Sequence, residues 1–322
     1  CTSGTAVLNY GPAIAEAYYQ HIPLIVITAD RPKEWIDQGD GQTIRQENVF
    51  SNYILQSMVF NGEEANVYDS LVIEDIIRTA ILKSGPVHIN VSLEEPLYKL
   101  TDISYENDLT DRLKIEAVFE REKLDEIVKL FDPSKKLLII AGQMQRDEGS
   151  DQILNKYAND KNAVVLTECT SNLFFENYIS CIDRTIDGFS EEDKENFKPD
   201  ILITIGIAIV SKKVKTWLRK YQPSYHIKIG SFDKEMDTFK CKTHSVDISI
   251  IGFFYLMLKG KISNRDYKES WMELNEQKAA KHHTFISSCD FSDLKVFSVL
   301  MNNIPSETLL HLGNSSPIRY AQ

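Results

Sequence analysis

The sequence predicts an α/β fold with doubly wound, mostly parallel sheets, and three observations point to it. Apolar runs of strand length, at residues 24–28 and 136–141 for example, lack polar alternation, which is typical of strands buried on both faces of a parallel sheet. Stretches with helical periodicity separate these runs in the order strand, helix, strand. The 322 residues, of which 43% are hydrophobic, provide material for about two domains.

The first hundred residues contain the first strand–helix series. Ser3, Gly4 and Thr5 offer helix-capping groups, and the small residues after them predict a helix over residues 6–20. A strand at 24–28, a helix at 71–83 and a strand at 85–91 continue the series. Residues 99–116 are polar and aperiodic, so we expect a linker there.

A second series of elements follows the expected linker. It comprises a helix at 122–131, a strand at 136–141, a helix at 150–159, strands at 163–166 and 200–206, a helix at 212–221 and a strand at 226–230. Helices at 271–282 and 293–302 and a strand at 308–312 come last. The chain begins without Met and stops one short loop after that strand, so we expect a piece of a longer protein.

Charge and cysteine usage narrow the class of protein. The chain has 36 Lys and Arg against 47 Asp and Glu, a net charge of −11, which argues against nucleic-acid binding. Its apolar runs are shorter than the roughly 18 residues of a membrane span, so none is expected. The five cysteines are widely spaced and form no CxxC pair, which is typical of reduced thiols in a cytoplasmic protein.

One candidate binding residue follows directly from the predicted sheet. Arg31 comes just after the strand at 24–28, and ligands of open α/β sheets bind beyond the carboxyl ends of strands. A guanidinium there could bind a carboxylate with two hydrogen bonds. A purely structural ion pair of Arg31 with Asp30 or Glu34 is the alternative.

The polar loop at residues 39–46 is a second candidate. It either presents Gln42 and Arg45 to a ligand or is a flexible surface loop. Its Gly39-Asp40-Gly41 resembles the start of the thiamine-diphosphate magnesium motif. However, no buried strand precedes it and no Asn-Asn pair follows at the required distance, so we do not assign that motif here.

The rest of the chain offers weaker signals. Gly142 and Gly206 follow predicted strands without extending to GxGxxG, so a nicotinamide-binding fingerprint is absent and tight turns are expected. Three further sets are a basic helix start at Ser211-Lys212-Lys213, an adjacent His282-His283 pair that we expect to be solvated, and an anion-binding set of Asn314, Ser315 and Arg319.

Taken together, several segments resemble the MenD family, thiamine-diphosphate-dependent enzymes of menaquinone biosynthesis. The matching segments run TSGTA at residues 2–6, ADRP at 29–32, GQTIRQ at 41–46, GPVHIN at 85–90 and GNSSPIR at 313–319. They occur in the family's order along the whole chain, although the middle region matches loosely.

The resemblance implies a domain organisation. We expect the C-terminal part of a pyrimidine-binding domain at 1–98, the linker at 99–116, a complete central Rossmann-like domain at 117–260 and the start of a diphosphate-binding domain, helices and first strand, at 261–322. Thiamine diphosphate and Mg²⁺ would be the cofactors, with their main binding motifs outside this chain. The 322 residues alone are therefore expected to be inactive.

The resemblance also implies a reaction, which is the synthesis of 2-succinyl-5-enolpyruvyl-6-hydroxy-3-cyclohexene-1-carboxylate (SEPHCHC). Family members decarboxylate 2-oxoglutarate and add the resulting succinyl-semialdehyde carbanion in conjugate fashion to isochorismate. The whole enzyme is expected to be a cytoplasmic homodimer or homotetramer.

Roles for individual residues follow from the matching motifs. Gln42 would be the catalytic residue; the substrate-binding residues would be Arg31, Lys212, Lys213, Asn314, Ser315 and Arg319; and the cofactor-binding residues would be Ser3, Gly4 and Thr5. No metal ligand is assigned to this chain. Lys213 stands where some members carry Arg, and Gly41 stands where some carry Asn, so those two contacts are in doubt.

Two alternatives remain open. The chain could belong to another thiamine-diphosphate-dependent decarboxylase that resembles acetohydroxyacid synthase, although such enzymes usually carry SGPG where residues 3–6 read SGTA. It could also be a non-catalytic Rossmann-like binding module, which should bind a dinucleotide.

Overall fold

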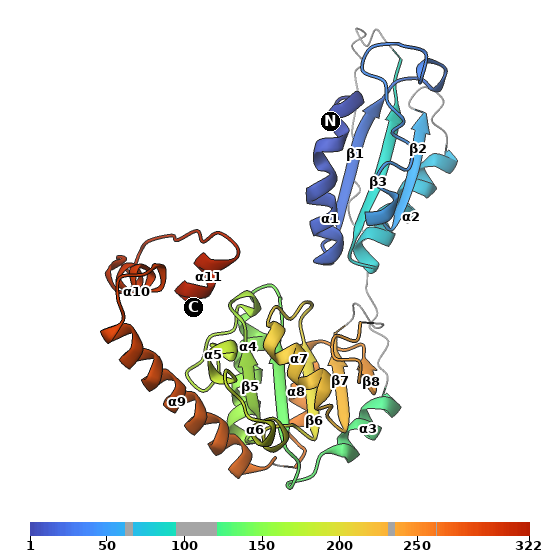
Figure 1. The fold of residues 1–322 in the computed structure, drawn as a ribbon. Coiled ribbons are helices and arrows are strands. Elements are labelled where there is room, and N and C mark those ends of the chain that lie inside the picture. Colours follow the sequence, from blue (N-terminus) through green and yellow to red (C-terminus); the bar gives the residue numbers. More distant parts are fainter. Residues whose placement is uncertain (62–66, 95–120, 231–235, 262) are drawn as a thin grey trace. The chain divides into compact units, whose positions relative to one another are not determined.

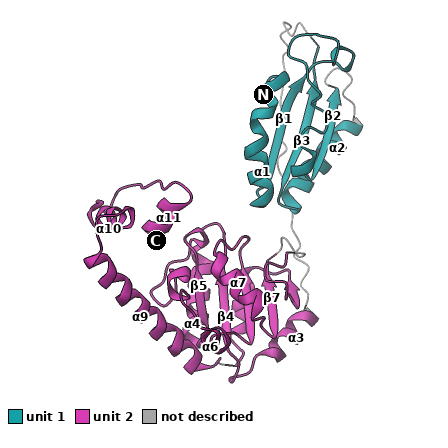
Figure 2. Ribbon diagram, viewed as in Figure 1, with its two compact units in different colours: residues 1–117 teal, residues 118–322 magenta. Residues whose placement is uncertain are grey.

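The computed structural model describes residues 1–61, 67–94, 121–230, 236–261 and 263–322, and its strands form two parallel sheets. The chain divides into two compact units, residues 1–117 and 118–322, which we call unit 1 and unit 2 (Figure 2). The α/β class predicted from the sequence is confirmed, because all strand pairs among the described residues are parallel. The expected linker at 99–116 lies outside the described residues, and the predicted domain boundaries stay predictions.

Unit 1 has a three-stranded sheet in the order β1-β3-β2 (Figure 1). Its elements are η1 (Gly4–Tyr10), α1 (Gly11–Tyr19), β1 (Leu24–Asp30), η2 (Lys33–Trp35), η3 (Ser51–Tyr53), β2 (Gln56–Asn61), α2 (Val67–Leu82) and β3 (Pro86–Ser92). One face of the sheet packs Val26 against Val7 and Ile14, which precede β1 in the sequence. The other face packs Val87 and Ile89 against α2.

Two sequence predictions for unit 1 need correction. The helix predicted at 6–20 is a 3-10 helix that becomes an α-helix at Gly11, because Pro12 has no N–H to donate to the preceding turn. Ser3 stands at the N-cap position, but its side chain makes no capping hydrogen bond.

The strand β1 is also less buried than its apolar sequence predicts. Ile25 and Ile27 are 41% and 58% exposed, whereas the first five residues of β3 are fully buried. The described part of the sheet explains the difference, since β1 lies at its edge and the buried residues of α2 pack over β3. Among the described residues of this unit, β3 is therefore the strand that is covered on both faces.

Unit 2 has a five-stranded parallel sheet in the order β5-β4-β6-β7-β8. The strands are β4 (Leu137–Ala141), β5 (Val164–Thr167), β6 (Ile201–Ile205), β7 (Tyr225–Ile229) and β8 (His244–Val246). The helices are α3 (Arg121–Leu130), α4 (Glu148–Asp160), η4 (Cys169–Ser171), α5 (Ile182–Thr185), α6 (Glu191–Asn196), α7 (Lys212–Lys220), α8 (Ile250–Met257), α9 (Arg265–Ser288), α10 (Asp293–Asn303) and α11 (Ser316–Ala321).

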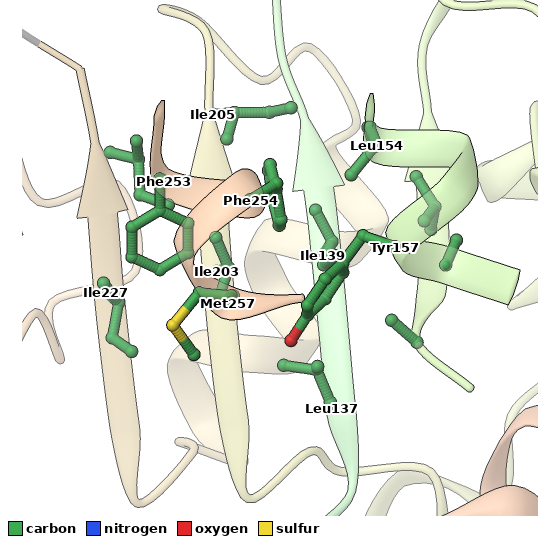
Figure 3. Close-up of a cluster of buried hydrophobic side chains, with 14 of the residues drawn as sticks. Leu137, Ile139, Leu154, Tyr157, Ile203, Ile205, Ile227, Phe253, Phe254 and Met257 are labelled. Atoms are coloured by element: carbon green, nitrogen blue, oxygen red, sulfur yellow. The ribbon is translucent and has the colours of Figure 1, made fainter. Parts of the chain in front are cut away.

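Alternate residues of the unit 2 strands enter two separate cores, which is the doubly wound arrangement. Leu137, Ile139 and Ile203 face α4 and α8, where the Tyr157 and Phe254 rings lie 4.9 Å apart (Figure 3). Their strand neighbours Leu138, Ile140 and Leu202 face the opposite core, which contains Trp217 of α7 and Trp271 of α9. Helix α9 is thus anchored to the central sheet by its first turns.

The strand predicted at 308–312 is wrong. These residues form no strand and no helix, and the Leu309 side chain is 82% exposed. A strand requires a neighbour for its backbone N–H and C=O groups, and within the described structure none lies beside this segment.

Candidate functional site

Buried polar side chains gather at the carboxyl ends of β1 and β3 in unit 1. Thr28 and Asp30 lie on β1, and His88 and Asn90 lie on β3; all four are at most 5% exposed. Both pairs occupy alternate strand positions, and Thr28 is paired in register with Asn90. The four side chains therefore share one face of the sheet, near the edge where parallel α/β sheets bind ligands.

Asn90 is the centre of a hydrogen-bonded network. Its Nδ2 donates to Oδ2 of Asp30 at 2.7 Å, and its Oδ1 accepts from the Thr28 hydroxyl at 2.7 Å. The same Oδ1 accepts from Nε2 of Gln46 at 2.9 Å. Since a buried polar group without partners is costly, this satisfied network is a stable feature of the sheet end.

Gln46 links the network to two other segments. Its Nε2 also donates to the carbonyl of Ala29 at 2.8 Å, and its Oε1 accepts from the backbone N–H of Gly4 at 2.8 Å. The Gln46 side chain is fully buried. One amide thus ties together β1, β3 and the start of the chain.

The hydrogen-bond directions show that Nε2 of His88 carries a proton. The Thr28 hydroxyl gives its only proton to Asn90, so it must accept from Nε2–H of His88, which lies 2.8 Å away. Burial lowers the His88 pKa to about 4, which keeps the ring neutral at pH 7. The ring is therefore a structural donor at neutral pH and carries no charge into the network.

The structure brings the predicted cofactor-binding segment against the predicted catalytic loop. A Cβ atom on Gly4, whose φ is +81°, would come within 3.2 Å of the Gln42 backbone. Gln42 itself adopts a left-handed backbone, with φ of 58°, and is exposed. Thr5 is exposed as well, whereas Ser3 and Gly4 are buried.

Arg31 lies where the sequence predicts it, immediately after β1. Its backbone N–H donates to Oδ1 of Asp30 at 2.8 Å, and its carbonyl accepts from the Ser92 hydroxyl at 3.4 Å. The backbone of this residue is therefore fixed on both sides. Its side chain is half-buried.

The loop at 39–46 is anchored at its far end. Arg45 forms an exposed 2.8 Å ion pair with Asp37, which contributes about 0–1 kcal/mol at most. Gln46 fixes the end of the loop far more firmly. The alternative of a flexible surface loop therefore fits the exposed middle of residues 39–46, but it does not fit the buried Gln46.

In unit 2, Lys212 and Lys213 line a cavity of about 380 Å³ beside α7. Its wall also includes Lys194, Lys220 and the ring of Trp217. Lys213 is ion-paired with Asp187, which lowers the pKa of that carboxyl through the hydrogen bond from the lysine. The two lysines are therefore together, but one of them already has an anionic partner.

Backbone fills the point in unit 2 where the strand order reverses, between β4 and β6. A Cβ on Gly142 would lie 2.5 Å from the Ala208 carbonyl oxygen, and Gly206 has a φ of +74°. The Gln143 N–H donates to Ala208 at 2.7 Å, and the Ile207 N–H donates back to Gln143 at 2.7 Å. The loops that follow β4 and β6 are thus hydrogen-bonded to each other at the usual place of a dinucleotide, and the tight turns expected at the two glycines stay a prediction.

The C-terminal candidates lie around the start of α11. Asn314, Ser315 and Arg319 are all exposed, and Oδ1 of Asn314 accepts from the Ser315 N–H at 2.7 Å. Arg319 is on the short helix rather than after a strand. This set is therefore accessible to solvent.

The residues of unit 1 fit a thiamine diphosphate site in part. Thr5 and Gln42 present exposed polar groups on contacting segments, and only glycine fits at position 4 between them. The Gly4 N–H is already bonded to Gln46, so it is not free to hold a ligand. Across the described ranges, no group of three or more His, Cys, Asp or Glu side chains could hold a metal ion.

Four residues of this site were missed by the sequence reasoning: Thr28, Gln46, His88 and Asn90. A signal was present, because His88 and Asn90 interrupt an apolar run at positions of equal parity, which places both on one face. Gln46 was seen only as the last letter of a motif.

The sequence is similar to those of known proteins. Residues 1–49 match the family model described as thiamine pyrophosphate enzyme, N-terminal TPP binding domain. The whole chain is similar to the 2-succinyl-5-enolpyruvyl-6-hydroxy-3-cyclohexene-1-carboxylate synthases of Flavobacterium johnsoniae and Flavobacterium psychrophilum, each 42% identical, and of Porphyromonas gingivalis, 35% identical. The chain spans 58% of the length of each of these relatives.

The fold is α/β, and the first 49 residues of the chain match the class of thiamine pyrophosphate enzymes. Over its whole length the chain is similar to 2-succinyl-5-enolpyruvyl-6-hydroxy-3-cyclohexene-1-carboxylate synthases, the family that its motifs resemble. None of the described helices is long and apolar enough to cross a membrane.

Proposed function

We propose that this chain supplies substrate-binding residues to a thiamine-diphosphate-dependent synthase that joins 2-oxoglutarate and isochorismate with loss of carbon dioxide. The observation that carries the proposal is the contact of the Gly4 segment with Gln42 at the carboxyl end of the unit 1 sheet. Both segments fall within the residues that match the thiamine-pyrophosphate domain. The whole enzyme would be a cytoplasmic homodimer or homotetramer with Mg²⁺ as second cofactor.

When bound, thiamine diphosphate supplies the nucleophilic carbon that this class of reaction needs. The chain's own residues would bind and orient two polyanionic substrates. The Arg31 guanidinium would hold one carboxylate from a backbone position that Asp30 and Ser92 fix. The exposed Gln42 amide would donate a hydrogen bond to substrate beside the cofactor.

The remaining predicted residues would add positive charge and neutral hydrogen bonds. Lys212 and Lys213 line one cavity, and they raise the local potential in a chain of net charge −11. Lys213 would have to leave Asp187 to bind a substrate carboxylate directly. Asn314, Ser315 and Arg319 are exposed and would complete a carboxylate and hydroxyl site.

The two alternatives have less support. A dinucleotide-binding module needs room at the strand reversal of unit 2, where the loops at Gly142 and Gly206 are in close backbone contact. A flavin-containing decarboxylase would need a comparable nucleotide cleft. Calorimetric titration with NAD or FAD separates these functions from the proposed one, since we expect no binding heat from either compound.

The decisive experiment is substitution of the two predicted carboxylate ligands. In a protein of the relatives' full length, Arg31→Ala and Arg319→Ala should each lower kcat/KM at least thirtyfold, or about 2 kcal/mol, because each removes a charge-assisted contact to substrate. Arg78→Ala is the matched control, because Arg78 is exposed and its ion pair among the described residues is with Glu74 of the same helix. Turnover at the wild-type rate in both variants would refute the assignment of Arg31 and Arg319.

A further inference from the structure

We propose that Gln46 is a positioning residue, which sets the backbone of both Gln42 and Arg31 without touching substrate. This inference rests on the function proposed above for those two residues. It follows from the contacts of a single buried amide and from the segments that these contacts join.

The Gln46 amide makes three hydrogen bonds to three segments that are distant in sequence. Its Nε2 donates to Ala29 and Asn90, 17 and 44 residues away, and its Oε1 accepts from Gly4, 42 residues away. The side chain is fully buried, so water does not replace a lost partner at low cost. Only a primary amide offers two donors and an acceptor in this geometry.

The first route of positioning runs through Gly4. Its N–H is held by Gln46, and its Cα side lies against the Gln42 backbone so closely that a Cβ would approach to 3.2 Å. Gln42 has a φ of 58°, a conformation that non-glycine residues adopt only where the surroundings impose it. The placement of Gly4 by Gln46 is such a constraint.

The second route runs through Asn90 and Asp30. Gln46 fixes the orientation of the Asn90 amide, because Oδ1 receives the Gln46 and Thr28 hydrogens and Nδ2 is left to donate to Asp30. The other Asp30 oxygen accepts from the Arg31 N–H. The same amide therefore constrains the chain at both predicted substrate contacts.

Substitution of Gln46 by glutamate tests the hydrogen bonds of its amide, because glutamate has nearly the same size but loses the two donors. In Gln46→Glu one oxygen can still accept from Gly4, but the other would face the Ala29 carbonyl and Oδ1 of Asn90. Rotating the Asn90 amide gives no relief, because its oxygen would then face the Asp30 carboxylate. The segments must shift apart, and a misplacement on the order of 1 Å costs about a hundredfold in rate.

The experiment compares Gln46→Glu and Gln46→Met with Gln38→Glu in the full-length protein. Gln38 is exposed and lies in the same region of unit 1, so its variant adds the same charge without touching the network. We expect both Gln46 variants to lower kcat at least tenfold, measured per folded molecule well below the unfolding temperature. The control should keep kcat within twofold. Hydrogen exchange at the Gly4 amide should accelerate at least tenfold in Gln46→Met, which loses the acceptor.

Two outcomes would overturn the inference. The first is a Gln46 variant that unfolds at lower temperature but keeps the wild-type kcat, since a merely structural role predicts that result. The second is unchanged exchange at Gly4 in Gln46→Met. If the wild-type protein shows no synthase activity, the proposed function fails while the exchange result still tests whether Gln46 holds the Gly4 segment.

Discussion

The two sheets of this protein contain the same buried polar arrangement. In unit 1 the strand β3 carries His88-Ile89-Asn90, and in unit 2 the strand β7 carries His226-Ile227-Lys228. Each histidine is hydrogen-bonded through Nε2 to a threonine of the neighbouring strand, at 2.8 Å and 3.0 Å. Each of these threonines, Thr28 and Thr204, is paired in register with the third residue, Asn90 or Lys228.

The difference lies in what the third residue contacts. Asn90 is hydrogen-bonded to Gln46, which ends the loop of Gln42, and to Asp30, which accepts from the Arg31 backbone. Lys228 donates to the carbonyl of Gly206, in the turn that closes the strand reversal. One arrangement therefore constrains loops that face solvent, and the other seals the fold.

This contrast teaches how to interpret polar residues inside apolar strands. The Thr–His pair alone stabilises a parallel sheet and says nothing about function, because it occurs in both units. A functional site is distinguished by further hydrogen bonds that connect the Thr–His pair to segments with exposed polar side chains. In this chain that connection is made by Asn90 and Gln46.

The largest expected effect comes from breaking the third position of each arrangement. Asn90→Leu removes the donor to Oδ2 of the buried Asp30 carboxylate and the acceptor of the Thr28 and Gln46 hydrogens, and should lower the free energy of unfolding of unit 1 by about 3 kcal/mol or more. Lys228→Met removes the charge together with its hydrogen bond, so we expect a smaller loss of about 1–2 kcal/mol. Denaturant unfolding, followed by hydrogen exchange of β1 and β6 peptides in the full-length protein, measures both. If Asn90→Leu lowered the free energy of unfolding by less than Lys228→Met does, the proposed difference between the units would be contradicted.

Much of the fold could be predicted from the sequence. The strands β1, β3, β4, β5, β6 and β7 were predicted within one or two residues, because a buried strand in a parallel sheet consists mostly of apolar residues. The strand β2 reads Gln56–Asn61 and was missed, since its partly exposed residues include polar ones. The helix α8 was missed because Ile250–Met257 is apolar on all sides and shows no helical periodicity.

The candidate site was predicted only in part, for a physical reason. Arg31 and Gln42 belong to short motifs that can be found locally in the sequence. Gln46 and Asn90 act through partners 44 and 60 residues away, and such pairings appear only when the strands are in register. The false strand at 308–312 has the same cause, because pairing is a property of the neighbour and not of the segment.

An intermediate effect is expected from pH, and it should affect both units. Burial lowers the pKa of His88 and of His226 to about 4, while Asp237, 3.7 Å from His226, opposes the shift there. The unfolded state binds protons near pH 6.5 and the folded state only near pH 4, so the unfolding free energy falls as pH is lowered between these values. The loss at pH 5 should be roughly 1–2 kcal/mol for each histidine.

Substitution assigns this loss to the individual units. His88→Gln should flatten the pH dependence of β1 and β3 exchange between pH 7 and pH 5, and His226→Gln should do the same for β6 and β7. The cross-effects should be absent, because the two histidines belong to separate sheets. An unaltered pH slope in both variants would show that other groups take up the protons.

The smallest expected effect is also the sharpest test of the comparison. Thr28→Val and Thr204→Val each replace one buried hydroxyl by a methyl group of similar size, and each should cost about 1 kcal/mol of stability. Thr28 also donates to Asn90, so its loss loosens the orientation of the amide that Gln46 and Asp30 share. We therefore expect Thr28→Val to lower kcat several-fold, and Thr204→Val to leave kcat unchanged at equal loss of stability. Steady-state kinetics beside thermal unfolding decides between the two, because equal kinetic effects would mean that the onward connection in unit 1 has no functional consequence.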